Sequence, residues 1–266
     1  MRPYVRIIAV ALFFVATPAG AEMAVHFIDV GQGGGVLIAK DGKHILYDCG
    51  DTFAGRSVID YLEALDVKTI DIMVISHAHR DHMGGCIDVL KQKDVKVRRI
   101  YHNGSRAKTG IWKQFLKVAQ RAGSVEVVEQ DVRDSGVHIL AAYVSHGQRY
   151  AKEADNSLLL QLVDGSVRVL LTGDCEATCE KQVSGVTDVS ADVLNIGHHG
   201  SNAASSPGFL KKVKPKIAVI QAGACNQYGH PTKPVLDRLK QVGATIYRTD
   251  QDGSVVVHSD GQTYKI

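Results

Sequence analysis

The feature that constrains this chain most is the run Ser76-His77-Ala78-His79-Arg80-Asp81-His82-Met83-Gly84-Gly85, which holds three histidines and one aspartate. The apolar residues 72–75 precede this run and predict a buried strand. An apolar-periodic segment that predicts a helix follows from residue 86. The polar side chains therefore lie on a loop between a strand end and a helix start, where an open α/β sheet normally carries its chemistry.

The spacing within this run predicts metal ligands. In extended backbone, side chains two residues apart point to the same side, so His77 and His79 can approach one ion. Asp81 and His82 follow the turn and can reach a second ion. Two ions about 3.5–4 Å apart can polarise a phosphoryl or carbonyl oxygen. The alternative is a solvated, histidine-rich loop, which does not account for four ligand-type residues in this order behind a buried strand.

The motif resembles the signature of the metallo-β-lactamase fold. The rest of the chain resembles one branch of that family, the hydrolase domain at the end of the competence protein ComEC. The matching segments run in family order: Phe27-Ile28-Asp29-Val30-Gly31-Gln32-Gly33, Tyr47-Asp48-Cys49-Gly50, Asn156-Ser157, Thr172-Gly173-Asp174, Gly197-His198-His199-Gly200-Ser201, Tyr228-Gly229-His230-Pro231 and Arg248-Thr249-Asp250. Alternating strands and helices indicate a layered α/β fold. The resemblance makes it a four-layer αββα sandwich with the site along one edge of the paired sheets.

The resemblance implies a ligand set for two divalent ions. Asp174 follows the apolar strand 167–171 and would bridge the two ions. His77 and His79 would hold one ion together with Asp174, and Asp81 and His82 would hold the other. Zinc is favoured for such nitrogen-rich ligands, with manganese and iron as alternatives.

Three further histidines are candidate ligands or catalytic groups. Either His198 or His199 would complete the second metal position, and the other would bind the leaving group or act as a general acid. Both, with Asp81, are the candidate catalytic residues. His146 stands where the wider superfamily has a metal-binding histidine, but a surface histidine is an equally good interpretation.

Residues outside the ligand set are expected to support it. The resemblance gives Asp48 the role of a carboxylate that hydrogen-bonds a metal-bound histidine and fixes its tautomer. Asn156 and His230 are expected to border the site or contact substrate. The family usually has an aspartate after Gly-Gln-Gly, whereas this chain has Gly34. That departure removes a site carboxylate.

The function implied is a metal-dependent hydrolase in which a metal-bridging hydroxide attacks a phosphodiester, either a small molecule or a nucleic acid such as DNA. One alternative is hydrolysis of a carbonyl compound such as a lactone, thioester or β-lactam. Another is a non-catalytic protein that keeps a metal as a structural clip. Against the clip, structural zinc sites are usually closed and hold a single ion.

The N-terminus predicts export. Arg2 and Arg6 precede a short apolar stretch, and Ala19-Gly20-Ala21 is typical of a cleavage site, so residues 1–21 are expected to be a signal peptide. The hydrolase domain would be residues 22–266, secreted or periplasmic, with no later membrane span. The alternative is an uncleaved anchor, for which the stretch is short. Without the two leader arginines the formal charge of +3 becomes nearly neutral, so charge does not favour nucleic-acid binding.

The five cysteines give an odd number in a chain expected to be exported. Cys175 and Cys179 are four residues apart and could meet on one helical face. Cys49, Cys86 and Cys225 each lie next to a predicted site loop. Disulfides or simple packing are favoured over thiolate ligands, because histidines and aspartates already fill the metal positions. The pairing does not follow from the sequence.

Overall fold

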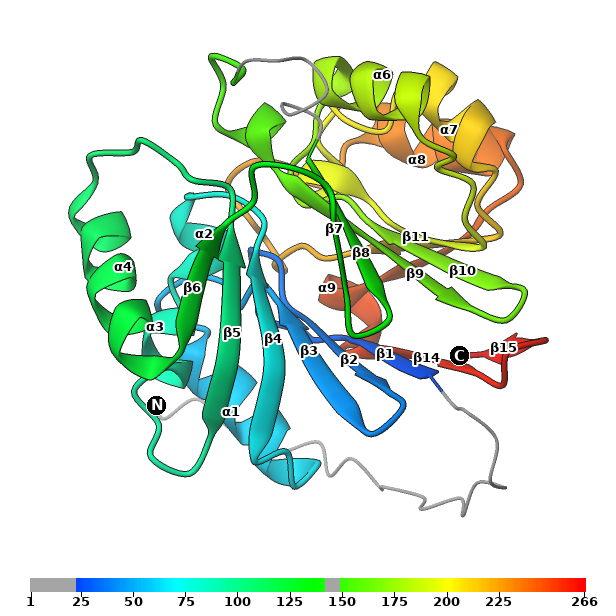
Figure 1. Cartoon of the computed structure of the whole chain (residues 1–266). Coiled ribbons are helices and arrows are strands. Elements are labelled where there is room, and N and C mark those ends of the chain that lie inside the picture. Colours follow the sequence, from blue (N-terminus) through cyan, green and yellow to red (C-terminus); the bar gives the residue numbers. More distant parts are fainter. Residues whose placement is uncertain (1–22, 142–148) are drawn as a thin grey trace, which may run out of the picture.

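The computed structural model describes residues 23–141 and 149–266, which form two β-sheets packed face to face (Figure 1). The first sheet has the order β15-β14-β1-β2-β3-β4-β5-β6. Its strands are β1 (Met23–Phe27), β2 (Val36–Lys40), β3 (Lys43–Tyr47), β4 (Thr69–Ile75), β5 (Lys96–His102), β6 (Ser124–Val127), β14 (Val255–Ser259) and β15 (Tyr264–Lys265).

The second sheet has the order β13-β12-β11-β10-β9-β8-β7. Its strands are β7 (Val132–Asp134), β8 (Val137–Ala141), β9 (Leu158–Asp164), β10 (Val167–Leu171), β11 (Val193–Asn195), β12 (Ile217–Ile220) and β13 (Thr245–Arg248). Strands β3 to β6 run parallel in one sheet, and β10 to β13 run parallel in the other. The carboxyl ends of these strands supply the loops that carry the site residues.

Helices cover the outer face of each sheet (Figure 1). The first sheet is covered by α1 (Gly55–Ala64), α3 (Cys86–Val89) and α4 (Gly110–Ala122). The second sheet is covered by α6 (Ala177–Val186), α7 (Pro207–Val213) and α8 (Lys233–Gln241). Two further four-residue helices, α2 (Arg80–Met83) and α9 (Thr249–Asp252), lie at strand ends.

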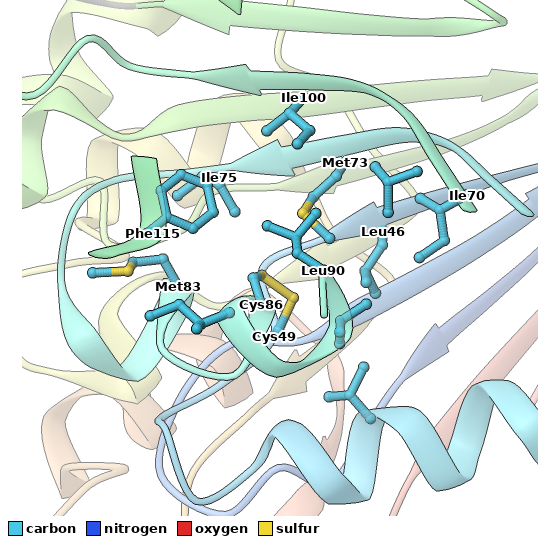
Figure 2. Close-up of a cluster of buried hydrophobic side chains, with 14 of the residues drawn as sticks. Leu46, Cys49, Ile70, Met73, Ile75, Met83, Cys86, Leu90, Ile100 and Phe115 are labelled. Carbon is cyan, nitrogen blue, oxygen red and sulfur yellow. A yellow bond between two sulfur atoms is a disulfide. The ribbon is translucent and has the colours of Figure 1, made fainter. Parts of the chain in front are cut away.

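The hydrophobic core has three parts, which lie between the four layers. Alternate residues of facing strands, such as Val25 and Leu160, fill the space between the two sheets. The opposite faces of the same strands pack against the helices, and the cluster of Figure 2 contains Met73 and Ile75 of β4 together with Phe115 of α4. This arrangement confirms the expected α/β fold, a four-layer αββα sandwich.

Two disulfides lie beside the loops at the carboxyl ends of the strands. Cys49 pairs with Cys86 and links the loop after β3 to the start of α3 (Figure 2). Cys175 pairs with Cys179 at the beginning of α6. Both links are buried, while Cys225 is exposed and unpaired. The pairing that the sequence left open is therefore defined by the fold.

Membrane-spanning helices can be sought only in the described residues. Within residues 23–141 and 149–266, every helix is too short or too polar to cross a bilayer. The expected signal peptide, residues 1–21, lies outside the described residues.

The pH dependence of stability should have a contribution from His102 at the end of β5. Its Nδ1 accepts a hydrogen bond from the Gly104 N–H at 2.9 Å, and Trp112 packs edge-on against its ring. Burial, with a smaller effect of Arg149, lowers the pKa of His102 to about 4, so the unfolded chain takes up the proton first as the pH falls below about 6.5. The stabilisation present above pH 6.5 is lost on the way to pH 4.

Replacing His102 by glutamine should therefore flatten this dependence. Between pH 8 and pH 5, denaturant titrations should show the wild-type free energy of unfolding falling by about 2 kcal/mol more than that of His102→Gln. Parallel curves for the two proteins would contradict the assignment.

Candidate metal centre

The site forms where loops from both sheets meet at one edge. Strand β4 delivers Ser76 and His77, and the short helix α2 begins four residues after Ser76. Strand β10 delivers Asp174, and β11 leads into a 3-10 turn, Gly197–Gly200, which carries two histidines. The turn before Asp174 requires glycine: Gly173 has a φ of +52°, and a Cβ there would lie 2.9 Å from the Tyr47 hydroxyl.

The first group of ligand-type side chains is His77, His79 and Asp174, whose candidate ligand atoms lie within 4.8 Å of one another. His77 and Asp174 are buried, while His79 is exposed at the mouth of the site. The Nε2 atom of His77 lies 3.5 Å from Oδ2 of Asp174. The structure therefore brings together the three residues expected to hold the first ion.

The second group is Asp81, His82 and His199, again with ligand atoms within 4.8 Å. Nε2 of His199 lies 3.3 Å from Oδ2 of Asp81 and 3.3 Å from Nε2 of His82. Three groups that each offer a lone pair or a proton thus converge on one point. This is the geometry expected of a second cation position.

The carboxylate of Asp174 lies between the two groups. Its Oδ2 faces His77, and its Oδ1 lies 3.0 Å from Nε2 of His82. Neither Nε2 of His77 nor Oδ1 of Asp174 has a hydrogen-bond partner of good geometry among the described residues. A buried polar atom left unpaired costs about 1–3 kcal/mol, and coordination to a cation would remove that cost. The residues therefore fit divalent metal ions, and the Asp174 carboxylate faces both groups.

The electrostatics of the group also favour bound positive charge. Burial alone would lower the pKa of His82, but the carboxylates of Asp174 and Asp48 raise it well above its usual value. Burial opposes ionisation of Asp174, yet the neighbouring imidazoles, His82 first among them, hold its pKa well below the usual range. The pKa of Asp81 is likewise lowered against burial, by the hydrogen bond from His199 and then by the charge of His82.

Asp48 orients His82. Its Oδ2 accepts a hydrogen bond from Nδ1 of His82 at 2.8 Å and another from the Ser76 hydroxyl at 2.6 Å. The Ser76 backbone N–H donates to the other carboxylate oxygen at 2.8 Å. With its Nδ1 proton held by Asp48, His82 is oriented so that Nε2 points into the site. Asp48 thus lies where the resemblance implied.

The structure places the two adjacent histidines differently. His199 is buried, and its Nδ1 donates to the Gln221 carbonyl oxygen at 2.9 Å, which leaves Nε2 for the second group. The His198 side chain is 29% exposed, its Nδ1 lies 3.1 Å from Oε1 of Glu176, and its Nε2 lies 3.6 Å from Oδ2 of Asp174. His199 therefore lies among the ligand-type residues, and His198 faces the open side.

The other residues that the sequence singled out belong to neither ligand group of the described part of the chain. His146 lies outside the described residues. The Asn156 side chain hydrogen-bonds the backbone of Tyr150 and Lys152, so it shapes the loop beside the site. The His230 ring lies 5.9 Å from the ring of His198, edge to face.

Gly34 lies directly over the Asp48–His82 pair. A Cβ at this position would come within 3.0 Å of Nδ1 of His82 and 3.5 Å of Oδ2 of Asp48. Glycine therefore leaves this hydrogen bond undisturbed. A side chain here would lie against the imidazole that Asp48 orients.

The sequence did not identify three residues that hydrogen-bond side chains of the site. They are Ser76, which bonds Asp48; Glu176, which bonds His198; and Gln221, whose carbonyl oxygen orients His199. Each follows the end of a buried strand by one to five residues. That position is the signal that could have identified them.

The fold and these side chains together define an αββα metal-dependent hydrolase. The chain belongs to the metallo-beta-lactamase superfamily, whose family model matches residues 28–223. ComE operon protein 3 of Bacillus subtilis is 29% identical over 92% of this chain and 34% of its own length. Recombination protein 2 of Haemophilus influenzae is 33% identical over 88% of this chain and 28% of its own length. These relatives confirm the resemblance to the competence-protein branch.

The chain spans about a third of the length of these curated relatives. Endoribonuclease YSH1 of Candida glabrata is a weaker relative, 20% identical over 79% of this chain and 30% of its own length. The crystal structure of the metallo-beta-lactamase fold protein YhfI from Bacillus subtilis has a TM-score of 0.61 at 16% identity, covering 90% of this chain and 100% of that chain. At that identity the likeness supports the fold alone.

The role of Asp48 predicts the effect of replacing it. In Asp48→Asn a neutral amide would face Nδ1 of His82, so the imidazole becomes less basic and less firmly oriented. We expect the weaker of two zinc affinities to fall about 10–100-fold, measured by competition with a chromophoric chelator. The control is Asp188→Asn, which removes an exposed carboxylate paired with Arg168. Equal affinities in the two variants would contradict the role.

Proposed function

We propose that this hydrolase is a two-metal phosphodiesterase. The observation that carries the proposal is the carboxylate of Asp174, whose two oxygens face two separate groups of imidazoles. Bound divalent cations would supply Lewis acidity to a phosphoryl oxygen and bring the pKa of water near neutrality. Zinc is the proposed metal because imidazoles dominate both groups, with manganese and iron as the alternatives.

The ligand roles follow the two groups. We assign His77, His79 and Asp174 to one ion, and Asp81, His82 and His199 with Asp174 to the other. Four of these six residues are histidines that the fold holds with at least one nitrogen toward the site. They would fix the positions of the ions and leave the exposed side at His79 open to substrate.

His198 is the proposed general acid. Oε1 of Glu176 accepts from its Nδ1, and Lys152 in turn lies 2.7 Å from the other Glu176 oxygen. The proton available for transfer is then the one on Nε2, beside Asp174 and on the solvent side. From there it can reach the leaving oxygen of a phosphodiester as the P–O bond breaks.

Nucleic acid is the proposed class of substrate. One relative is named a competence protein, another a recombination protein and a third an endoribonuclease. The formal charge of the chain, +3, is too small to supply binding by itself, so recognition would depend on contacts around the metals. If the protein does not hydrolyse a phosphodiester, the alternative is a carbonyl substrate such as a lactone, thioester or β-lactam.

The first test is turnover of bis-p-nitrophenyl phosphate by protein loaded with zinc or manganese, with the metal content measured. Turnover should require metal and fall at least about 100-fold in Asp81→Asn, while Asp188→Asn behaves as wild type. A folded protein that holds two metals and leaves this substrate intact would refute the phosphodiesterase.

The same turnover assay can test the proposed role of His198 as the general acid. His198→Gln should leave bis-p-nitrophenyl phosphate turnover nearly unchanged, because p-nitrophenolate leaves without a proton. For a thymidine dinucleotide, whose leaving alkoxide needs one, kcat should fall about 100-fold. Equal losses on both substrates would instead indicate a ligand or structural role.

We further propose that the chain is exported, with cleavage after Ala21. Two buried disulfides are typical of proteins that fold in an oxidising compartment, and the sequence of residues 1–21 has the features of a leader. When the full chain is expressed in a bacterial host, N-terminal sequencing of the periplasmic or secreted protein should begin near Glu22. Recovery of only the uncleaved chain, in the membrane fraction, would favour the anchor.

A further inference from the structure

Two aromatic side chains are exposed among the described residues, and both belong to loops at the metal edge. Phe53 is 88% exposed and Tyr228 is 59% exposed, whereas the other described phenylalanine, tyrosine and tryptophan side chains are buried or half-buried. Phe53 follows β3 of the first sheet, and Tyr228 follows β12 of the second. An exposed aromatic ring near a site can stack on a planar group of a ligand.

Tyr228 is connected to the metal centre through two other rings. It stacks on His230 with centroids 5.7 Å apart and planes 25° apart. His230 meets His198 edge-on at 5.9 Å, and Nε2 of His198 lies 3.6 Å from Oδ2 of Asp174. A row of rings therefore leads from solvent to the bridging carboxylate.

The loop that carries Tyr228 is held in place before any ligand arrives. Oδ1 of Asn226 accepts hydrogen bonds from the backbone N–H groups of Tyr228 and His230, at 3.1 and 3.0 Å. Its Nδ2 donates to the carbonyl oxygens of Gly223 and His230. The exposed position of the Tyr228 ring is therefore built into the fold.

The loop that carries Phe53 packs against the central motif. Its neighbour Thr52 touches the loop of the central motif so closely that a Cβ on Gly84 would lie 2.5 Å from the Thr52 backbone nitrogen. Nε of Arg80 donates to Asp51 at 2.9 Å, and Arg80 directly precedes Asp81. The Arg80 side chain is 61% exposed, so the loop of Phe53 holds a solvent-accessible cation through Asp51.

We propose that Tyr228 and Phe53 are stacking platforms for the nucleobases on either side of the scissile phosphate, and that the substrate is therefore a single-stranded nucleic acid. This inference rests on the phosphodiesterase proposed above. Bases in a duplex are already stacked on one another, whereas those of a single strand can lie on protein aromatic rings. Arg80 is placed to contact an adjacent phosphate.

The test is binding of two labelled phosphorothioate oligomers of equal length to the zinc-loaded full chain, followed by fluorescence anisotropy. One is oligothymidylate, and the other has the same backbone without bases. Wild type should bind the base-bearing strand about tenfold more tightly. Tyr228→Ala and Phe53→Ala should each lose about tenfold on that strand alone, and Tyr228→Phe and Phe53→Tyr should retain the affinity.

Val186→Ala is the matched control, because Val186 is also 59% exposed and lies at the end of α6. Equal wild-type affinity for the two strands, undetectable binding of both, or alanine variants that bind as wild type would each overturn the inference. So would a duplex that binds as tightly as the single strand. Wild-type turnover of bis-p-nitrophenyl phosphate reports separately on the proposed phosphodiesterase, so the two failures are distinguishable.

Discussion

The site depends on an electrostatic contact between the two sheets. The carboxylate of Asp174 belongs to the second sheet, yet His77 and His82, which face its two oxygens, belong to the first. Neither sheet alone contains both ligand groups. The buried apolar layer between the sheets therefore sets the distance between these charges, and a shift of one sheet along the other would separate the carboxylate from its partners.

Hydrogen bonds across the same edge hold the sheets at that spacing. The Tyr47 hydroxyl donates to the Leu158 carbonyl oxygen at 2.7 Å, and the Leu158 N–H donates to the Ser76 carbonyl oxygen at 2.8 Å. Gly173 has no side chain between them, so the loop of Asp174 approaches closely. The Asp48 carboxylate accepts hydrogen bonds from the Ser76 N–H and from Nδ1 of His82, so it ties the His82 ring to this contact between the sheets.

Part of this could be predicted from sequence. The strand 167–171 and its following aspartate could be placed because an apolar run ends sharply there, and the order of ligand-type residues after residue 75 indicated two metal positions. The strand β9 could not be predicted in this way, because its leucine-rich run fits a helix equally well. Nor could the different positions of His198 and His199 be predicted. Both have left-handed backbone, with φ of 50° and 55°, and their partners Glu176 and Gln221 come from other elements. The cysteine pairing likewise needed the three-dimensional fold.

The split of the ligands between two sheets has a consequence for the order of folding. His77 and Asp174 are far apart in the chain, so closing the segment between them removes a large amount of chain entropy before either gains a partner. A cation cannot find its complete coordination until the halves have docked. Ion capture would then be a late event, and bound ions would lower the population of every opened form by mass action.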